Sequence, residues 1–249
     1  MKQLFIYLSV FLIHCGVIVA QNIEQLKKQY QQLSDTQKKT DLLLNLGKAF
    51  EKKDLDSAIF YYKKSLQLNE NSNDTLAASI YTRIGGAYLL KGNYDVSLDY
   101  QLKALKLYDE HPFTEGKLKV YNGIALVYFY QEQYDKALEN FNLTEKLLHK
   151  HSKENSKKVF KFKGKLFNNI GIIYASKKQY DLALEYFTRA ATFSKKANDF
   201  DNLSSLYANS GLIYIKTKHF ELAEAALIES LQIRQKEKIS SACARPIIF

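Results

Sequence analysis

One sequence pattern occurs five times along this chain, and it limits the folds that the chain can adopt. Each copy has a large residue, usually an aliphatic residue three positions later, then a small residue, and an aromatic residue three positions after that. The small residues are separated by 38, 40, 46 and 40 positions, and they are Gly47, Gly85, Ala125, Gly171 and Gly211. A period of this length indicates one supersecondary unit per copy, stacked on its neighbours to bury a continuous core.

A second pattern follows each copy and predicts that both halves of the repeat are helices. In the clearest case Tyr180-Asp181-Leu182-Ala183 is followed by Phe187 and Ala190 on one helical face. Short polar turns such as Lys91-Gly92-Asn93 separate the two halves. We expect the small residue of the first helix to let the second helix pack closely against its backbone. The chain has 2 Pro and 10 Gly, fewer than an all-β protein with many tight turns would need.

This double pattern resembles the tetratricopeptide repeat (TPR), whose signature places a large residue, Leu, Gly and Tyr in the first helix and Ala and Phe in the second. The resemblance covers about residues 40–236. It implies an all-α fold, a right-handed α-solenoid of about five helix-turn-helix repeats with an additional N-terminal helix. The period exceeds the family's usual 34 residues, which implies longer helices or longer links. The array is expected over residues 40–237, with repeats at about 40–73, 78–112, 118–151, 164–198 and 204–237.

The segments that flank the array are expected to differ from the repeats. Residues 21–39 are predicted to form a helix that caps the stack, with Ser34 and Gln37 as a capping box that opens the first repeat. Residues 238–249 fit no repeat and form an apolar tail. That tail folds back on the array, meets a partner, or marks a chain cut short relative to a longer relative.

Residues 1–20 have the layout of a secretory signal peptide, with a basic start, an apolar run and a small residue at the end. We expect cleavage after Ala20 and a secreted or periplasmic protein. One alternative is an uncleaved membrane anchor, since the 17 residues 4–20 lie at the low edge for crossing a bilayer. Another is acylation of Cys15, although His14 fits lipoprotein processing poorly. No transmembrane segment is expected after signal removal.

The net charge of +10 comes from lysines spread along the chain, with the densest stretch between Lys150 and Lys165. This charge suits either a solvated surface or a patch for an acidic partner. No recognition motif for DNA or RNA accompanies it, so a nucleic-acid partner is not expected.

No motif for catalysis, metal binding or a cofactor is present. The chain has no phosphate-binding loop, HExxH, CxxC or Gly-x-Ser-x-Gly. His149 and His151 are two residues apart, which places them on different faces of a helix and makes them a poor metal pair. We therefore expect no enzyme activity, no metal and no cofactor.

The resemblance also indicates where a ligand would bind, because the first helix of each repeat lines the concave face in that family. Asn recurs near the small residue in four of the five repeats, and an amide both donates and accepts hydrogen bonds. Such amides suit the backbone of an extended peptide, while Lys and Arg attract acidic groups. The alternative is that Asn only keeps the helix soluble. Leu44 stands where the family's clamp for a C-terminal carboxylate has Lys, so that ligand is not expected. The candidate binding residues are Asn45, Lys48, Thr82, Arg83, Lys119, Asn122, Lys165, Asn168, Asn169 and Asn209.

The function that the resemblance implies is a non-catalytic scaffold that binds a protein or peptide outside the cytoplasm through this concave face. The alternative is the extracytoplasmic sensor portion of a truncated bacterial signalling or transcription regulator, because arrays behind a signal peptide look like the outer halves of such regulators.

Overall fold

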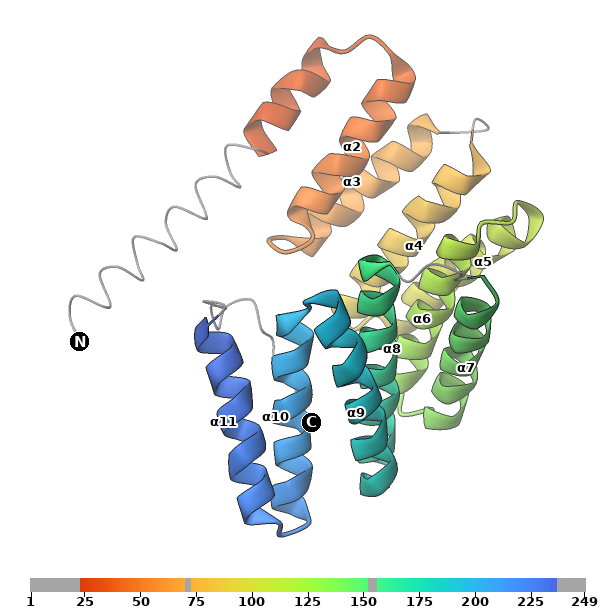
Figure 1. Cartoon of the computed structure of the whole chain (residues 1–249). Helices are drawn as coiled ribbons and strands as arrows, with labels where there is room; N and C mark the ends of the chain where they lie inside the picture. The colour runs from red at the N-terminus through yellow and green to blue at the C-terminus, as the bar shows by residue number, and fades with distance from the viewer. Residues whose placement is uncertain (1–22, 70–72, 152–155, 237–249) are drawn as a thin grey trace, which may run out of the picture. The chain divides into compact units, whose positions relative to one another are not determined.

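A computed structural model describes residues 23–69, 73–151 and 156–236. All regular structure in these residues is helical and none is strand, which confirms the expected all-α fold class (Figure 1). Within the same ranges, no helix combines the length and the apolar character needed to cross a membrane. The expected signal peptide at residues 1–20, with Cys15, and the tail at residues 238–249 lie outside the described residues.

The chain divides into two compact units, residues 1–127 and 128–249, which we call unit 1 and unit 2. In unit 1, helical residues 23–32 precede α2 (Thr36–Phe50), α3 (Leu55–Leu68), α4 (Asp74–Leu90), α5 (Tyr94–Glu110) and most of α6 (Thr114–Tyr130). Unit 2 contains α7 (Tyr134–His151), α8 (Lys157–Ser176), α9 (Tyr180–Ala197), α10 (Phe200–Lys216) and α11 (Phe220–Lys236). We call the even-numbered helices A helices and the odd-numbered helices B helices. The pairs α2–α3, α4–α5, α8–α9 and α10–α11 are antiparallel hairpins (Figure 1).

The first A helix begins one residue later than the predicted capping box requires. Its N-cap is Asp35, whose carboxylate accepts a hydrogen bond of 2.7 Å from the backbone N–H of Lys38. The prediction of Ser34 as the cap is therefore wrong. The carboxylate of Asp35 is a good acceptor for the first-turn N–H groups and lies at the helix end that favours negative charge. Gln37 instead lies within the helix and bonds Asp41 at 3.4 Å.

Four of the turns between an A helix and its B helix share one left-handed residue. Gly92 has φ of 77°, and Glu132, Lys178 and Lys218 have φ between 60° and 62° at the corresponding positions. This conformation lets the chain reverse within three residues, and it favours glycine because a Cβ crowds the backbone there. The same turn geometry therefore recurs although the residue at its centre differs.

In the four hairpins α2–α3, α4–α5, α8–α9 and α10–α11, the glycine of the A helix is where the B helix approaches closely. A Cβ added at Gly171 would lie 2.6 Å from the ring of Phe187, and one at Gly211 would lie 2.8 Å from Cγ of Leu227. Distances this short are not compatible with a larger side chain unless the helices separate. The predicted packing role of these small residues is confirmed.

The cores of unit 1 lie within and between its hairpins. Leu44 of α2 and Ile80 and Ile84 of α4 are buried in one cluster with Ala58 and Tyr62 of α3. At the N-terminal end, Ile23 is buried with Leu43 and Leu46 of α2, so the helical residues 23–32 cover the first hairpin. Burial of such apolar side chains stabilises the fold by roughly 1.5–3 kcal/mol each.

Consecutive repeats are also joined by ion pairs at equivalent positions. Lys91 at the end of α4 pairs with Asp56 of α3, and Lys177 at the end of α8 pairs with Asp135 of α7 at 2.7 Å. Each lysine follows the last turn of an A helix and reaches the first turn of the preceding B helix. Exposed pairs of this kind add little stability.

Candidate functional site

Three cationic side chains lie within electrostatic reach of one another on the A helices of unit 1. Lys48 is on α2, Arg83 on α4 and Lys119 on α6, so each of the first three repeats supplies one. The Lys48 ammonium donates a hydrogen bond of 3.2 Å to Oδ1 of Asn45, one turn earlier on α2. Residues far apart in the sequence therefore form one polar surface. We call Asn45, Lys48, Arg83, Lys119 and the half-buried Asn122 of α6 the A-helix face.

The electrostatics of this face combine repulsion among its cations with attraction from nearby carboxylates. Partial burial lowers the pKa of Lys48 below its usual value, and repulsion from Arg83 is the next largest cause. Lys119 acts in the same direction, while Glu51 and Asp41 oppose it. Cations held near one another at a partly desolvated surface repel, and an anionic group placed among them would relieve that repulsion.

Two of these cations already have carboxylate partners. The Arg83 guanidinium pairs with Glu51 at 3.0 Å, and Lys119 pairs with Glu115 at 2.8 Å one turn away on α6. Both pairs are partly exposed, so solvent and salt weaken them. An acidic ligand can compete for these cations at moderate free-energy cost.

Glu51 and Tyr62 belong to the site, although sequence reasoning missed both. The Tyr62 hydroxyl donates a hydrogen bond to Oε1 of Glu51, the same oxygen that pairs with Arg83. Tyr62 is buried under α2, and burial raises the pKa of its hydroxyl, with the hydrogen bond to Glu51 as the second cause. A tyrosine in place of the phenylalanine of the repeat pattern was the available signal, because its hydroxyl needs a polar partner.

The backbone of α4 is open one turn after Arg83. Among the described residues, a Cβ added at Gly86 would meet no atom of another segment within 4 Å, so a partner's chain can approach the helix closely there. One turn earlier, Thr82 is half-buried, and its hydroxyl donates 2.8 Å to the carbonyl of Ala78. Below it, the buried amide of Gln101 on α5 donates 3.3 Å to the carbonyl of Thr82. Thr82 thus connects the surface with the interior of the hairpin.

In unit 2, the structure separates the candidate residues into two kinds. Asn168 of α8 and Asn209 of α10 are only 5% and 8% exposed, and Nδ2 of Asn209 donates to Oδ1 of Asn168 at 3.3 Å. These two amides bind each other across neighbouring A helices. Lys165 is exposed and Asn169 is half-buried on α8. The amides that recur in the sequence therefore do not form one exposed series.

The residues of this site could bind a charged group, but they do not supply a metal centre. Among the described residues, no group of three or more His, Cys, Asp or Glu side chains is placed to hold a metal ion. The A-helix face of unit 1 offers cationic donors, amides and accessible backbone. Such groups are suited to non-covalent recognition of acidic and peptide groups.

This chain is similar in sequence to one protein family and similar in fold to several solved structures. A tetratricopeptide repeat family model matches residues 76–148 and 164–236, and a second tetratricopeptide repeat model matches residues 40–72. No curated protein sequence is significantly similar to this chain.

Three solved structures illustrate the likeness in fold. BtubC (BKLC) from P. vanneervenii has a TM-score of 0.69 and 19% identity, over 94% of this chain and 94% of that chain. A Rap protein complexed with competence and sporulation factor has a TM-score of 0.67 and 12% identity, over 90% of this chain and 72% of that one. A signal transduction ATPase with a tetratricopeptide repeat sensor, from Pyrococcus horikoshii, has a TM-score of 0.70 and 22% identity, over 90% of this chain and 34% of that one.

Proposed function

The chain belongs to the tetratricopeptide repeat family, and we propose that it is a non-catalytic scaffold that binds an acidic segment of a protein or peptide outside the cytoplasm. Helical repeat arrays present extended surfaces suited to protein partners. The Rap protein, which shares the fold, was solved with competence and sporulation factor bound. The binding surface in this proposal is the A-helix face of unit 1.

The observation that carries the proposal is the placement of Lys48, Arg83 and Lys119 on three successive A helices. A segment that lies across these helices meets a cation on each of them. The amides of Asn45 and Asn122 lie on the same face, where they are placed to bond the segment's backbone. Acidic side chains in the segment would then replace Glu51 and Glu115 as partners of the cations.

Binding of a defined acidic peptide tests this surface directly. The probe is a fluorescein-labelled peptide with four consecutive glutamates, and the reference is the same peptide with four glutamines. Anisotropy titrations should show tighter binding of the glutamate peptide. The change Arg83→Ala should weaken it about tenfold, as expected for one charge-assisted hydrogen bond. Equal affinity for the two peptides would contradict the proposal.

A control must separate a specific surface from the general positive charge of the chain. The variant with Lys48, Arg83 and Lys119 all changed to Ala should lose the glutamate peptide. A variant with alanine at Lys27, Lys146 and Lys236 removes the same charge from exposed positions elsewhere and should retain most of the affinity. If both triple variants lose affinity equally, binding is governed by net charge and the A-helix face is not the site.

The extracytoplasmic location in the proposal rests on residues 1–20 and has a separate test. Fusing residues 1–30 to alkaline phosphatase, which is active only after export, should give an active enzyme in a bacterial host. N-terminal sequencing of the exported fusion should begin at Gln21. An inactive fusion would remove the export part of the proposal and leave the binding surface unaffected.

The second candidate function is the sensor portion of a bacterial signalling or transcription regulator. It is favoured by the likeness to the ATPase from Pyrococcus horikoshii that carries a tetratricopeptide repeat sensor, of which this chain covers 34%. Genomic sequence beyond the codon for Phe249 distinguishes the two functions. An in-frame apolar helix followed by a kinase or DNA-binding pattern would favour the sensor, and a stop codon would favour the scaffold.

A further inference from the structure

The hairpins α4–α5 and α8–α9 contain the same three-ring aromatic stack. In unit 1, Tyr100 stacks on Tyr88 with ring centroids 5.7 Å apart and contacts Tyr81 at 5.9 Å. In unit 2, the rings at the matching positions are Tyr186 on Tyr174 at 5.3 Å and Phe167 at 6.1 Å. The interplanar angles also correspond, at 9° and 40° in unit 1 and 18° and 47° in unit 2.

In unit 2, further side chains cover this aromatic stack. The ring of Phe193 on α9 packs 5.6 Å from Phe167 and stacks 6.1 Å from Phe160 of α8. Arg189 lies over the Phe167 ring at 4.1 Å and pairs with Glu145 of α7 at 2.9 Å. As a result Phe167 is only 4% exposed. The groove between the B helices α7 and α9 is therefore filled by an aromatic ring and bridged by an ion pair.

In unit 1, the equivalent positions carry residues that leave Tyr81 only half-buried, although Lys103 lies over the neighbouring Tyr100 ring at 5.1 Å. Leu107 stands where α9 has Phe193, each 22 positions after the glycine of its hairpin, and Ala77 stands where α8 has Lys163. Leu66 of α3 replaces Glu145, and Lys103 replaces Arg189. Lys103 pairs with Asp99 on its own helix at 2.7 Å, so it does not bridge to α3 as Arg189 bridges to α7.

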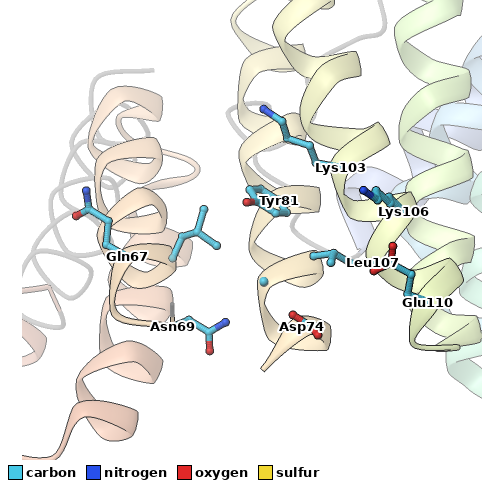
Figure 2. A pocket seen from close by; sticks show the side chains of 10 residues that line it. Gln67, Asn69, Asp74, Tyr81, Lys103, Lys106, Leu107 and Glu110 are labelled. Carbon is cyan, nitrogen blue, oxygen red and sulfur yellow. The ribbon is translucent and has the colours of Figure 1, made fainter. Parts of the chain in front are cut away.

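The consequence is a pocket of about 530 Å³ between α3, α4 and α5 (Figure 2). Leu66, Ala77, Tyr81 and Leu107 supply its apolar lining, and Tyr81 is half-buried. The pocket lies within unit 1, and its volume is in the range of pockets that bind ligands. Charged side chains surround this lining, among them Lys106 and Glu110 of α5, as Figure 2 shows.

We propose that this pocket receives an aromatic side chain of a partner protein or peptide, which takes the place that Phe193 occupies in unit 2. The chain itself shows which group fits this surface, because Phe193 covers the corresponding three-ring stack in the α8–α9 hairpin. An aromatic ring on Tyr81 gains offset or edge contacts in addition to apolar burial. This surface differs from the A-helix face and does not depend on the proposed function.

The mixed charge around the pocket supports an aromatic residue within a peptide rather than a strongly charged ligand. Lys103 is paired with Asp99, and Asp74 is paired with His111 at 2.9 Å. The remaining rim charges, Lys106 and Glu110, have opposite signs. The rim therefore gives no net preference for an anion or a cation, and the apolar lining provides the selectivity.

The test measures binding of N-acetyl-L-phenylalanine amide to the full chain by protein NMR. The probe is small, so a Kd on the order of 1 mM is expected, with shift changes at Ala77 and Leu107. N-acetyl-L-leucine amide should bind at least threefold more weakly. No saturable binding of the phenylalanine probe, or equal binding of the two probes, would overturn the proposal.

Three substitutions exchange the residues that distinguish the units. Leu107→Phe fills the pocket with the ring found in unit 2 and should raise the Kd at least tenfold. Ala77→Lys narrows it from α4 and should have the same effect, so the test does not depend on one variant's folding. Phe193→Leu opens the groove of unit 2 and should leave the shift changes at Ala77 unaltered. Unchanged affinity in folded Leu107→Phe protein, checked by circular dichroism, would place the probe elsewhere.

The glutamate-peptide titration provides an independent control. Leu107→Phe should not alter binding of that peptide, because the A-helix face contains none of the pocket residues. Loss of binding of both probes in Leu107→Phe protein that is folded by circular dichroism would overturn the assignment of separate surfaces.

Discussion

Unit 1 and unit 2 differ at the B-helix position that packs against the glycine of the A helix. In unit 1 this position holds Tyr62 and Gln101, whose side chains end in polar atoms. In the α8–α9 and α10–α11 hairpins of unit 2 it holds Phe187 and Leu227. The backbone arrangement is shared, but in unit 1 the atom nearest to a Cβ at Gly85 is the amide nitrogen of Gln101, while ring carbons of Tyr62 lie nearest at Gly47.

This difference agrees with the proposed function, in which unit 1 serves recognition while the same repeat serves packing in unit 2. In unit 1, Tyr62 bonds Glu51 and Gln101 bonds the carbonyl of Thr82, so the interior is connected to the A-helix face. In unit 2, the side-chain contacts between A and B helices at Gly171 and Gly211 are apolar. The amides of Asn168 and Asn209 instead bind each other between two A helices. We infer that unit 1 carries the binding surface at some expense of stability.

The largest effect should follow loss of the apolar contact in unit 2. Phe187→Ala removes a buried ring against Gly171 and should destabilise unit 2 by about 3–5 kcal/mol. Hydrogen exchange of α8 and α9 amides measures this, because repeat arrays can unfold in parts. Phe220→Ala, at a 65% exposed position of the same unit, should change stability by less than about 0.5 kcal/mol. Equal effects of the two changes would show that the ring contact does not support unit 2.

The next effect compares two glycines. Gly171→Ala places a Cβ 2.6 Å from the Phe187 ring and should cost about 1–3 kcal/mol by overpacking. Gly86→Ala, where no atom lies within 4 Å, should stabilise α4 by about 0.5–1 kcal/mol, because alanine is the better helix former. Urea unfolding followed by circular dichroism measures both. The same sign for both changes would contradict the packing described here.

A third change makes unit 1 resemble unit 2. Gln101 is buried, and its Oε1 has no hydrogen-bond partner. Gln101→Met keeps the unbranched shape and removes the unsatisfied carbonyl, so unit 1 should gain about 1–2 kcal/mol. Hydrogen exchange of α4 and α5 measures the gain, and Gln232→Met at an exposed site of α11 is the control. A loss of stability would show that the bond from Gln101 to Thr82 outweighs the unpaired oxygen.

The smallest effect appears only at alkaline pH. Burial raises the pKa of Tyr62, so the folded state keeps this proton when the unfolded state, with a pKa of about 10, releases it. Stability is therefore unaffected below pH 10 and falls above it, by about 1.4 kcal/mol per pH unit for one proton. Tyr62→Phe should remove this part of the decline. Urea unfolding at pH 9 and pH 11 measures the free energy of unfolding at each pH. An equal loss of this free energy in the wild-type and Tyr62→Phe proteins would exclude Tyr62 as the cause.

Several features of the site could be predicted because they depend on position within one helix. The A-helix location of Lys48, Arg83 and Lys119 followed from their spacing to the small residues. The capping residue was misplaced by one position, since Ser34 and Asp35 are both good caps and only the chain's path shows which one meets Lys38. The role of Glu51 was missed, because an acidic residue at a helix end is usually no more than a solvated surface group.

The burial of the unit 2 amides could not be predicted from the sequence pattern. Asn209 stands two positions before its glycine, as Asn45 does, and Asn168 stands three before Gly171, but only Asn45 is exposed. Their burial depends on how closely the next A helix approaches, and that distance is decided by residues in other helices. The filled and open grooves over the two aromatic stacks have the same origin. Each results from contacts between side chains about 20 to 45 positions apart, such as Arg189 with Glu145.

The sequence by itself determined the all-α repeat fold, the pairing of A and B helices and the contact of each glycine with its B helix. These features depend on the order and spacing of apolar and small residues, which repeat five times and leave few other ways to bury the apolar faces. Only the tertiary structure decided which polar residues form a surface, which are buried in pairs, and which aromatic stack stays open. Those outcomes depend on contacts between neighbouring repeats, where the side chains differ from one interface to the next although the helices are arranged alike.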